Sequence, residues 1–143
     1  LKTRYAEKKQ VSQSKNMDTD KKQKILVVEN DVFMIELLTN DLQAAGFDTI
    51  VAKTGIEGVL QFKAGKPDLV LLDILLPDQN GFETLRQIRR SPGGPETTII
   101  ILSNIAEGSD MDEARRLGVK DYLVKANFTL PEILEKVKAV LRK

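Results

Sequence analysis

The residues best suited to chemistry in this sequence stand directly behind short apolar runs. The most informative is Asp73, which ends the run 69–72 and is followed by Pro77 and Gly81. A carboxylate in this place lies at the carboxyl edge of a buried strand, where open α/β sheets bind their ligands. Because Pro and Gly stop the strand and force a loop, we expect Asp73 to be presented to solvent and not enclosed.

Polar residues follow three other apolar runs in the same way. If these runs are parallel strands of one sheet, their polar residues gather with Asp73 at one edge. They are Glu29, Asn30 and Asp31 after 25–28, Ser103 and Asn104 after 98–102, and Lys125 after 122–124. Carboxylate and amide oxygens suit a hard cation such as Mg²⁺, while a hydroxyl and an ammonium suit a phosphoryl group. The set predicts a site where Asp73 attacks phosphorus while Mg²⁺ and Lys125 neutralise the transferred group.

The elements that position these residues can be predicted from periodicity. From Lys24 onward, short β-branched runs alternate with segments of helical period, two of which open with the capping boxes 54–57 and 129–132. The alternation predicts an α/β fold, a (βα)₅ doubly wound parallel five-stranded sheet with helices on both faces. Strands are expected at 25–28, 48–51, 69–72, 98–102 and 122–124, and helices at about 31–45, 54–65, 80–90, 109–117 and 129–141.

Length and composition exclude several classes of protein. The 143 residues suit one domain, and we expect no second domain after the last helix. The absence of Cys excludes disulfides, thiol catalysis and Cys-based zinc sites, and the absence of His excludes hydrolase triads and phosphohistidine carriers. No apolar stretch approaches the roughly 20 residues that span a bilayer, and no signal-peptide pattern opens the chain. A cytoplasmic protein is expected.

Charge is distributed unevenly along the chain. Residues 1–24 carry a net charge of +5 and the remainder −4, although the whole chain carries only +1. Residues 1–23 are therefore predicted to be a disordered basic arm, and residues 24–143 the folded domain. Because the chain starts with Leu and Met17 looks like a more natural start, the arm is either non-native in part, an upstream extension or part of a longer protein. We interpret it as a solvated tail and expect no direct nucleic-acid binding.

Residues 24–143 resemble a receiver domain of the two-component response-regulator family, of the single-domain type. The resemblance rests on four motifs in the right order, at residues 25–29, 73–77 with Gly81, 101–103 and 121–125. It implies the flavodoxin-like strand order 2-1-3-4-5. It also implies that Asp73 is the phosphoacceptor, Ser103 the switch hydroxyl, Lys125 the partner of the phosphoryl group and Tyr122 the aromatic that reports the state.

The same resemblance implies a metal and partners. Mg²⁺ would be bound by Glu29, Asn30, Asp73 and the backbone of Leu75. The phosphodonor would be a histidine kinase or a histidine phosphotransfer protein. The output would be a protein target that binds the face formed by helix 109–117, strand 122–124 and the last helix. Such a domain is a signalling module and not an enzyme, apart from slow self-dephosphorylation.

Three residues depart from the family pattern. Asn30 stands where the metal ligand is commonly Asp, so one negative charge is missing and Mg²⁺ should bind more weakly. Asp31 either compensates or starts the first helix. Asn104 replaces a small residue and could narrow access for the phosphoryl group. Ala126 replaces the usual Pro, and a cis peptide bond is not expected there because it costs roughly 3 kcal/mol without proline.

These departures motivate an alternative function, a pseudo-receiver that binds partners without being phosphorylated. An aspartate-nucleophile phosphatase is disfavoured, because the segment after Asp73 lacks the second Asp of such enzymes. Each candidate residue also has a purely structural interpretation. These are a turn former for Asp73, helix-start acids for Glu29 and Asp31, a strand-end hydroxyl for Ser103, a partly buried aromatic for Tyr122, a solvated loop residue for Lys125, and a solvated helix face for Arg86, Arg89 and Arg90.

Overall fold

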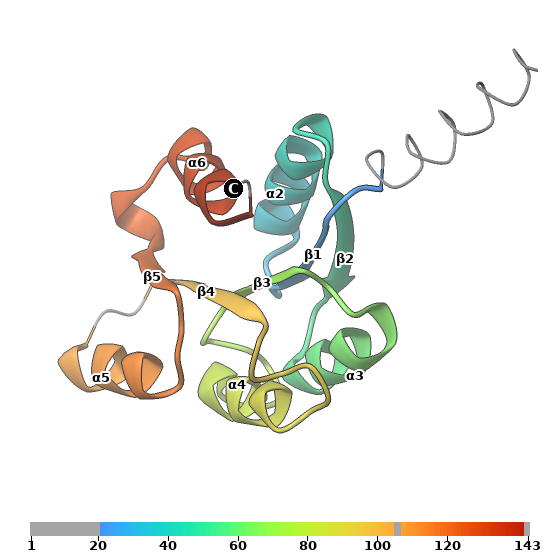
Figure 1. Ribbon diagram of the computed structural model, residues 1–143. Coiled ribbons are helices and arrows are strands. Elements are labelled where there is room, and N and C mark those ends of the chain that lie inside the picture. Colours follow the sequence, from blue (N-terminus) through green and yellow to red (C-terminus); the bar gives the residue numbers. More distant parts are fainter. Residues whose placement is uncertain (1–20, 105–106, 142–143) are drawn as a thin grey trace, which may run out of the picture.

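The computed structural model describes residues 21–104 and 107–141, and it confirms the predicted alternation of strands and helices (Figure 1). The predicted arm lies outside the described residues except for 21–23. The strands are β1 (Lys24–Val28), β2 (Asp48–Ala52), β3 (Leu69–Leu72), β4 (Thr98–Ser103) and β5 (Asp121–Val124). The helices are α2 (Val32–Ala44), α3 (Gly55–Gly65), α4 (Gly81–Arg89), α5 (Gly108–Arg116) and α6 (Leu130–Leu141), with a 3-10 turn η1 (Lys125–Asn127) that the sequence did not predict.

The five strands form one parallel sheet in the order β2-β1-β3-β4-β5, which confirms the flavodoxin-like α/β fold. The most apolar strand, β3, lies at the centre, as expected for a strand buried on both faces. Val28 pairs with Leu72, and Leu72 pairs with Ile101. β1 and β3 therefore end at the same level, and β4 continues for two more residues to Ser103 at the same edge of the sheet.

Helices cover both faces of the sheet. Figure 1 shows α2 and α6 on one face and α3, α4 and α5 on the other. Because side chains alternate along a strand, Leu26 and Val28 pack under the second group of helices while Ile25 and Val27 pack under the first. The same alternation in β3 and β4 completes two apolar clusters, one on each face. No helix among the described residues is long and apolar enough to cross a membrane.

Side-chain caps fix where the helices begin. The box at α6 is complete, since Thr129 Oγ1 accepts from the Glu132 N–H at 3.3 Å and a Glu132 carboxylate oxygen accepts from the Thr129 N–H at 2.8 Å. At α3, Thr54 Oγ1 accepts from the Glu57 N–H, but Glu57 accepts from the N–H of Lys53, one residue earlier. Both capping boxes therefore start helices where the sequence predicted them.

Arg89 corrects the interpretation of the arginine cluster as a solvated face. Its guanidinium donates hydrogen bonds to four backbone carbonyls at 2.7–2.9 Å, two in the α4–β4 loop and two behind α5. The acceptors are Gly94, Thr97, Leu117 and Gly118. A planar fork with five N–H donors can join segments in this way, and the helical period of α4 gives no sign of these loop carbonyls.

Candidate functional site

Asp73 follows β3 directly and is only 6% exposed, so the expectation of a solvent-presented carboxylate was wrong. The loop behind it folds back instead of leading away, and the Gly81 N–H donates to the Ile74 carbonyl at 2.7 Å. A Cβ atom on Gly81 would lie within 2.3 Å of the Asp73 carbonyl oxygen. Glycine is required here because the backbone of α4 starts against the end of β3. The Leu75 N–H also donates to Asp73 Oδ1 at 3.3 Å.

Lys125 contacts both acids of the site. Its ammonium donates to Glu29 Oε1 at 2.8 Å and to Asp73 Oδ2 at 3.3 Å, and all three side chains are almost fully buried. The three residues follow the ends of β1, β3 and β5. The parallel sheet therefore brings Lys125 and Glu29 together although they are 96 residues apart in sequence. The interpretation of Lys125 as a solvated loop residue was therefore wrong.

The buried pair of carboxylates shifts the pKa values within the site. Burial raises the pKa of Glu29 above its usual value, and the negative charge of Asp73 raises it further, against the hydrogen bond from Lys125. Desolvation alone would lower the pKa of Lys125, but the hydrogen bonds and charges of Glu29 and Asp73 raise it above its usual value. Lys125 therefore stays charged at neutral pH and compensates the two acids.

Of the three residues behind β1, only Glu29 points into this cluster. Asn30 is exposed, and its amide nitrogen donates to the Lys53 carbonyl at 3.3 Å. Asp31 is the N-cap of α2, where Oδ1 accepts from the N–H groups of Phe33 and Met34. Asp31 thus starts the helix and does not replace the missing charge at Asn30.

The oxygen atoms of the site fit a hard cation, but only two of the side chains that supply them are negatively charged. Glu29 and Asp73 direct oxygens at the same point, where an ammonium now lies, and oxygen ligands are the kind that Mg²⁺ prefers. Within the described part of the chain, no three Asp, Glu, His or Cys side chains form a metal-binding group. The oxygens that converge here are therefore those of two carboxylates, Glu29 and Asp73, and the predicted roles of Asn30 and the Leu75 backbone as metal ligands stay predictions.

Ser103 and Tyr122 lie beside this cluster on β4 and β5. Ser103 is fully buried at the end of β4, opposite Val124 in the sheet register, and Lys125 follows Val124 as the first residue of η1. Tyr122 is half-buried and packs against the apolar core cluster on the face of the sheet covered by α3, α4 and α5. Burial raises the pKa of Tyr122, as do the charges of Asp110 and Asp73, whereas a hydrogen bond with Ser103 opposes the shift. The hydroxyl groups of Ser103 and Tyr122 are thus in contact, and the charge of Asp73 acts on Tyr122.

The two remaining departures have simpler outcomes. The Lys125–Ala126 peptide bond is trans, as expected. Asn104 is exposed, and the two residues after it lie outside the described residues, so its effect on access to Asp73 stays a prediction.

Sequence reasoning missed Asp78, which ties the loop behind Asp73 to α3. Its carboxylate accepts from the N–H groups of Gly55 and Ile56 at 2.8 and 2.9 Å. Desolvation alone would raise the pKa of Asp78, but these hydrogen bonds at a helix N-terminus lower it below its usual value. An acid inside a Pro-Asp turn is a weak signal for such a contact, because the same residue suits the turn itself.

Comparison with known proteins places the chain in a family. Residues 25–138 match the response regulator receiver domain. The DNA-binding response regulator MtrA of Mycobacterium tuberculosis is 37% identical over 127 residues, which cover 89% of this chain and 54% of that protein. The chain therefore spans about half the length of the curated relatives it matches.

Solved structures agree with this match. A CheY-like receiver domain protein from Methanospirillum hungatei has a TM-score of 0.79 at 26% identity, covering 85% of this chain and 94% of that one. The BeF3-activated N-terminal receiver domain of Klebsiella pneumoniae RstA has a TM-score of 0.74 at 28% identity, covering 85% of this chain and all of that one.

Proposed function

Because the chain belongs to the response regulator receiver domain family, a family of two-component signalling, we propose that Asp73 accepts a phosphoryl group from a histidine kinase or a histidine phosphotransfer protein. The observation that carries the proposal is the contact of one ammonium, Lys125 Nζ, with both Asp73 Oδ2 and Glu29 Oε1. A buried carboxylate beside a fixed positive charge can receive a phosphoryl group whose own charge must be neutralised.

In the proposed transfer, a carboxylate oxygen of Asp73 attacks the phosphorus of a phosphohistidine. The new O–P bond forms as the N–P bond to the donor imidazole breaks, and the imidazole nitrogen leaves with the bonding pair. The Lys125 ammonium, which contacts the Asp73 carboxylate, can move to the phosphoryl oxygens and neutralise their negative charge. The protein acts here as a signalling phosphoacceptor and not as an enzyme with turnover of a separate substrate.

Mg²⁺ is the proposed cofactor, bound by Glu29, Asp73, Asn30 and the backbone of Leu75. When bound, it neutralises charge on the phosphoryl oxygens. Asn30 contributes a neutral oxygen in place of a carboxylate, so we expect weaker Mg²⁺ binding than a three-carboxylate site would have.

The signal is proposed to pass through Ser103 and Tyr122. A phosphoryl group on Asp73 adds close to two negative charges and three acceptor oxygens. Ser103 can donate a hydrogen bond to the phosphoryl group. Tyr122, which is hydrogen-bonded to Ser103, would then lose this partner. The result is a shift between two states of the face formed by α5, β5 and α6, to which a protein target in the cytoplasm would bind.

The test is phosphorylation by a small acyl or amido phosphate in the presence of Mg²⁺, followed by the mass of the intact protein. We expect a gain of one phosphoryl group, its loss in Asp73→Asn, and its retention in Asp48→Asn. Asp48 is a matched control because it is an exposed acid at the opposite end of an edge strand. No gain in the unmodified chain, or an equal gain in Asp73→Asn, would refute Asp73 as the phosphoacceptor.

A second candidate is a pseudo-receiver that binds a partner without phosphorylation. The geometry behind β1 favours it, since Asp31 is occupied as a helix cap and Asn30 is neutral. Calorimetric titration with Mg²⁺ separates the two functions. Binding at millimolar or tighter concentration that is lost in Glu29→Ala and in Asp73→Ala supports the phosphoacceptor, and absence of binding supports the pseudo-receiver.

A further inference from the structure

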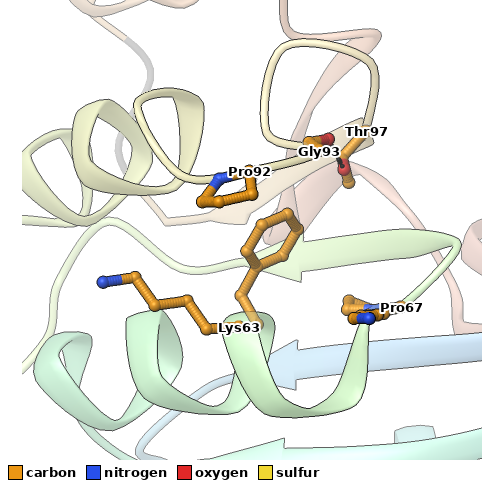
Figure 2. Close-up of a pocket in the computed structure, with 7 residues that line it drawn as sticks. Lys63, Pro67, Pro92, Gly93 and Thr97 are labelled. Carbon is orange, nitrogen blue, oxygen red and sulfur yellow. Dashed lines mark hydrogen bonds between the residues drawn. The ribbon is translucent and has the colours of Figure 1, made fainter.

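A hollow of about 720 Å³ lies at the end of the sheet opposite to Asp73. It opens between the last turn of α3, the segment that leads into β3, and the loop between α4 and β4 (Figure 2). This volume is in the range of pockets that bind small organic molecules. We call it the basal hollow, and its lining residues are Phe62, Lys63, Lys66, Pro67, Pro92, Gly93 and Thr97.

The floor of the basal hollow is apolar and built from rings. Phe62 and Pro67 are buried, and Pro92 lies across the opening from them. Figure 2 shows Pro92 and Gly93 on the wall that faces Lys63 and Pro67. Apolar side chains on both sides of a hollow suit an apolar ligand body, since small-molecule pockets are lined mainly by such side chains.

The rim of the basal hollow is cationic. Lys63 and Lys66 are exposed, and neither forms an ion pair with another residue that the structure describes. No acidic side chain is among the lining residues. The acids next to lining residues in sequence are Asp68 and Glu96, and a carboxylate oxygen of Asp68 accepts from the Lys24 N–H at 2.7 Å. A smaller hollow of about 300 Å³ shares Lys63 and Pro92 and adds Arg90, again without a carboxylate in its lining.

The wall formed by the α4–β4 loop is held in place before any ligand arrives. Arg89 donates to the carbonyls of Gly94 and Thr97 at 2.7 Å each. Thr97 Oγ1 donates to the Gly93 carbonyl at 2.7 Å, and the Gly94 N–H donates to the Ser91 carbonyl at 2.8 Å. A preformed wall does not have to be ordered on binding, which favours affinity.

Lys66 adds an independent observation from the backbone. It caps α3 in the left-handed conformation, with φ 47° and ψ 61°, and is the sole non-glycine residue with positive φ among the described residues. Glycine is the usual residue at such a cap because a side chain is strained there. A lysine in its place keeps the strain and adds a second cationic side chain to the lining of the basal hollow.

We propose that the basal hollow binds a small amphipathic anion, with an apolar body against Pro67 and Pro92 and a carboxylate or phosphate bound by Lys63 or Lys66. Asp73 lies six residues after Pro67, with β3 between them, which is about 20 Å at the rise of a strand. The site is therefore separate from the phosphoacceptor and does not depend on the function proposed for Asp73.

The test uses the full chain, isotopically labelled, and follows amide NMR shifts during titration. The probes are naphthoate and naphthyl phosphate, with naphthylmethanol as the neutral control. We expect saturable shifts confined to residues 62–67 and 92–97, at least threefold tighter binding of one anion than of the alcohol, and unchanged binding in Asp73→Asn. The anion that binds tighter identifies the anionic group. Equal binding of the alcohol, or shifts elsewhere in the chain, would overturn the proposal.

Two variants test the rim without endangering the fold. Lys66→Gly removes the ammonium and also relieves the left-handed strain, so it should be at least as stable as the unmodified chain. We expect it to weaken anion binding about threefold, and Lys63→Met to do the same. Lys120→Met, an exposed lysine outside the hollow, should leave binding unchanged. Undiminished affinity in the combined Lys63→Met, Lys66→Gly variant would rule out the cationic rim as the anion site.

Discussion

The contact of Lys125 with two buried acids predicts a large and pH-dependent loss of stability in Lys125→Met. The substitution keeps most of the apolar stem but removes the ammonium that lies 2.8 Å from Glu29 and 3.3 Å from Asp73. The side chains of Lys125, Glu29 and Asp73 are 10%, 4% and 8% exposed, so water replaces the lost charge poorly. The variant leaves two acids facing each other without a cation.

The magnitude follows from the burial and the distances. Two unit charges about 3 Å apart attract by about 5 kcal/mol at an effective dielectric constant of about 20. Removing one partner of a buried pair costs about 3–5 kcal/mol. We therefore expect the free energy of unfolding to fall by about 3 kcal/mol at neutral pH, which lowers the urea midpoint by about 1.5 M for a domain of this size.

The sign of the pH dependence follows from Glu29. Its pKa is raised by burial, so the protonated form favours the folded state, and this stability is present below pH 4.5 and is lost as pH rises through the folded-state pKa. Lys125→Met removes the hydrogen bond that lowers this pKa, so the pKa rises further. The variant should therefore lose less stability at about pH 5 than at about pH 7.5, since Glu29 takes up a proton.

Urea unfolding followed by circular dichroism, in buffer with a chelator, measures both effects. Lys138→Met is the matched control, because its 3.9 Å pair with Glu135 is solvent-exposed on the glutamate side and should contribute about 0.5 kcal/mol. Added Mg²⁺ should recover part of the loss in Lys125→Met by replacing the ammonium between the acids. A loss at neutral pH no larger than that of the control, or equal losses at both pH values, would refute the reasoning.

Three further predictions concern how the site is held. Arg89→Met should cost about 2–4 kcal/mol, because four carbonyls lose a donor, whereas exposed Arg90→Met should cost under about 0.5 kcal/mol; urea unfolding of both variants compares them directly. Gly81→Ala should cost about 1–3 kcal/mol and move the Asp73 amide resonance, since its Cβ meets the Asp73 carbonyl; an unmoved resonance would contradict this. The pKa of Asp78 is lowered, so its stabilisation is present above pH 3.8 and is lost as pH falls through the folded-state pKa; Asp78→Asn should flatten that acid limb in a pH series of unfolding curves.

Much of the fold could be predicted from the sequence because the strands and helices carry their own signals. Fully apolar runs such as 69–72 indicate a strand buried on both faces, and capping residues such as Thr129 and Glu132 mark a helix start through local hydrogen bonds. The gathering of Glu29, Asp73 and Lys125 at one edge also followed, since the carboxyl ends of parallel strands share an edge. These inferences depend only on interactions within a few residues or on the topology of the sheet.

Burial and contacts between distant loops could not be predicted in the same way. Pro77 and Gly81 indicate a loop, but not that the loop folds back to Ile74 or that Asp73 is buried. Arg89 resembles any arginine on a polar helix face until four carbonyls of two other segments are placed around it. Asp31 is equally suited to a metal or to a helix cap, and its contact with two N–H groups decides for the cap.

The sequence by itself determined the order of strands and helices, the sheet edge where the polar residues meet, and the acid at its centre, because hydrophobic periodicity and strand-end residues are local properties. Only the tertiary structure decided that Asp73 is buried, that Lys125 bridges it to Glu29, and that a cationic hollow lies at the other end of β3. Those features depend on distances between side chains far apart in the chain, and packing sets these distances.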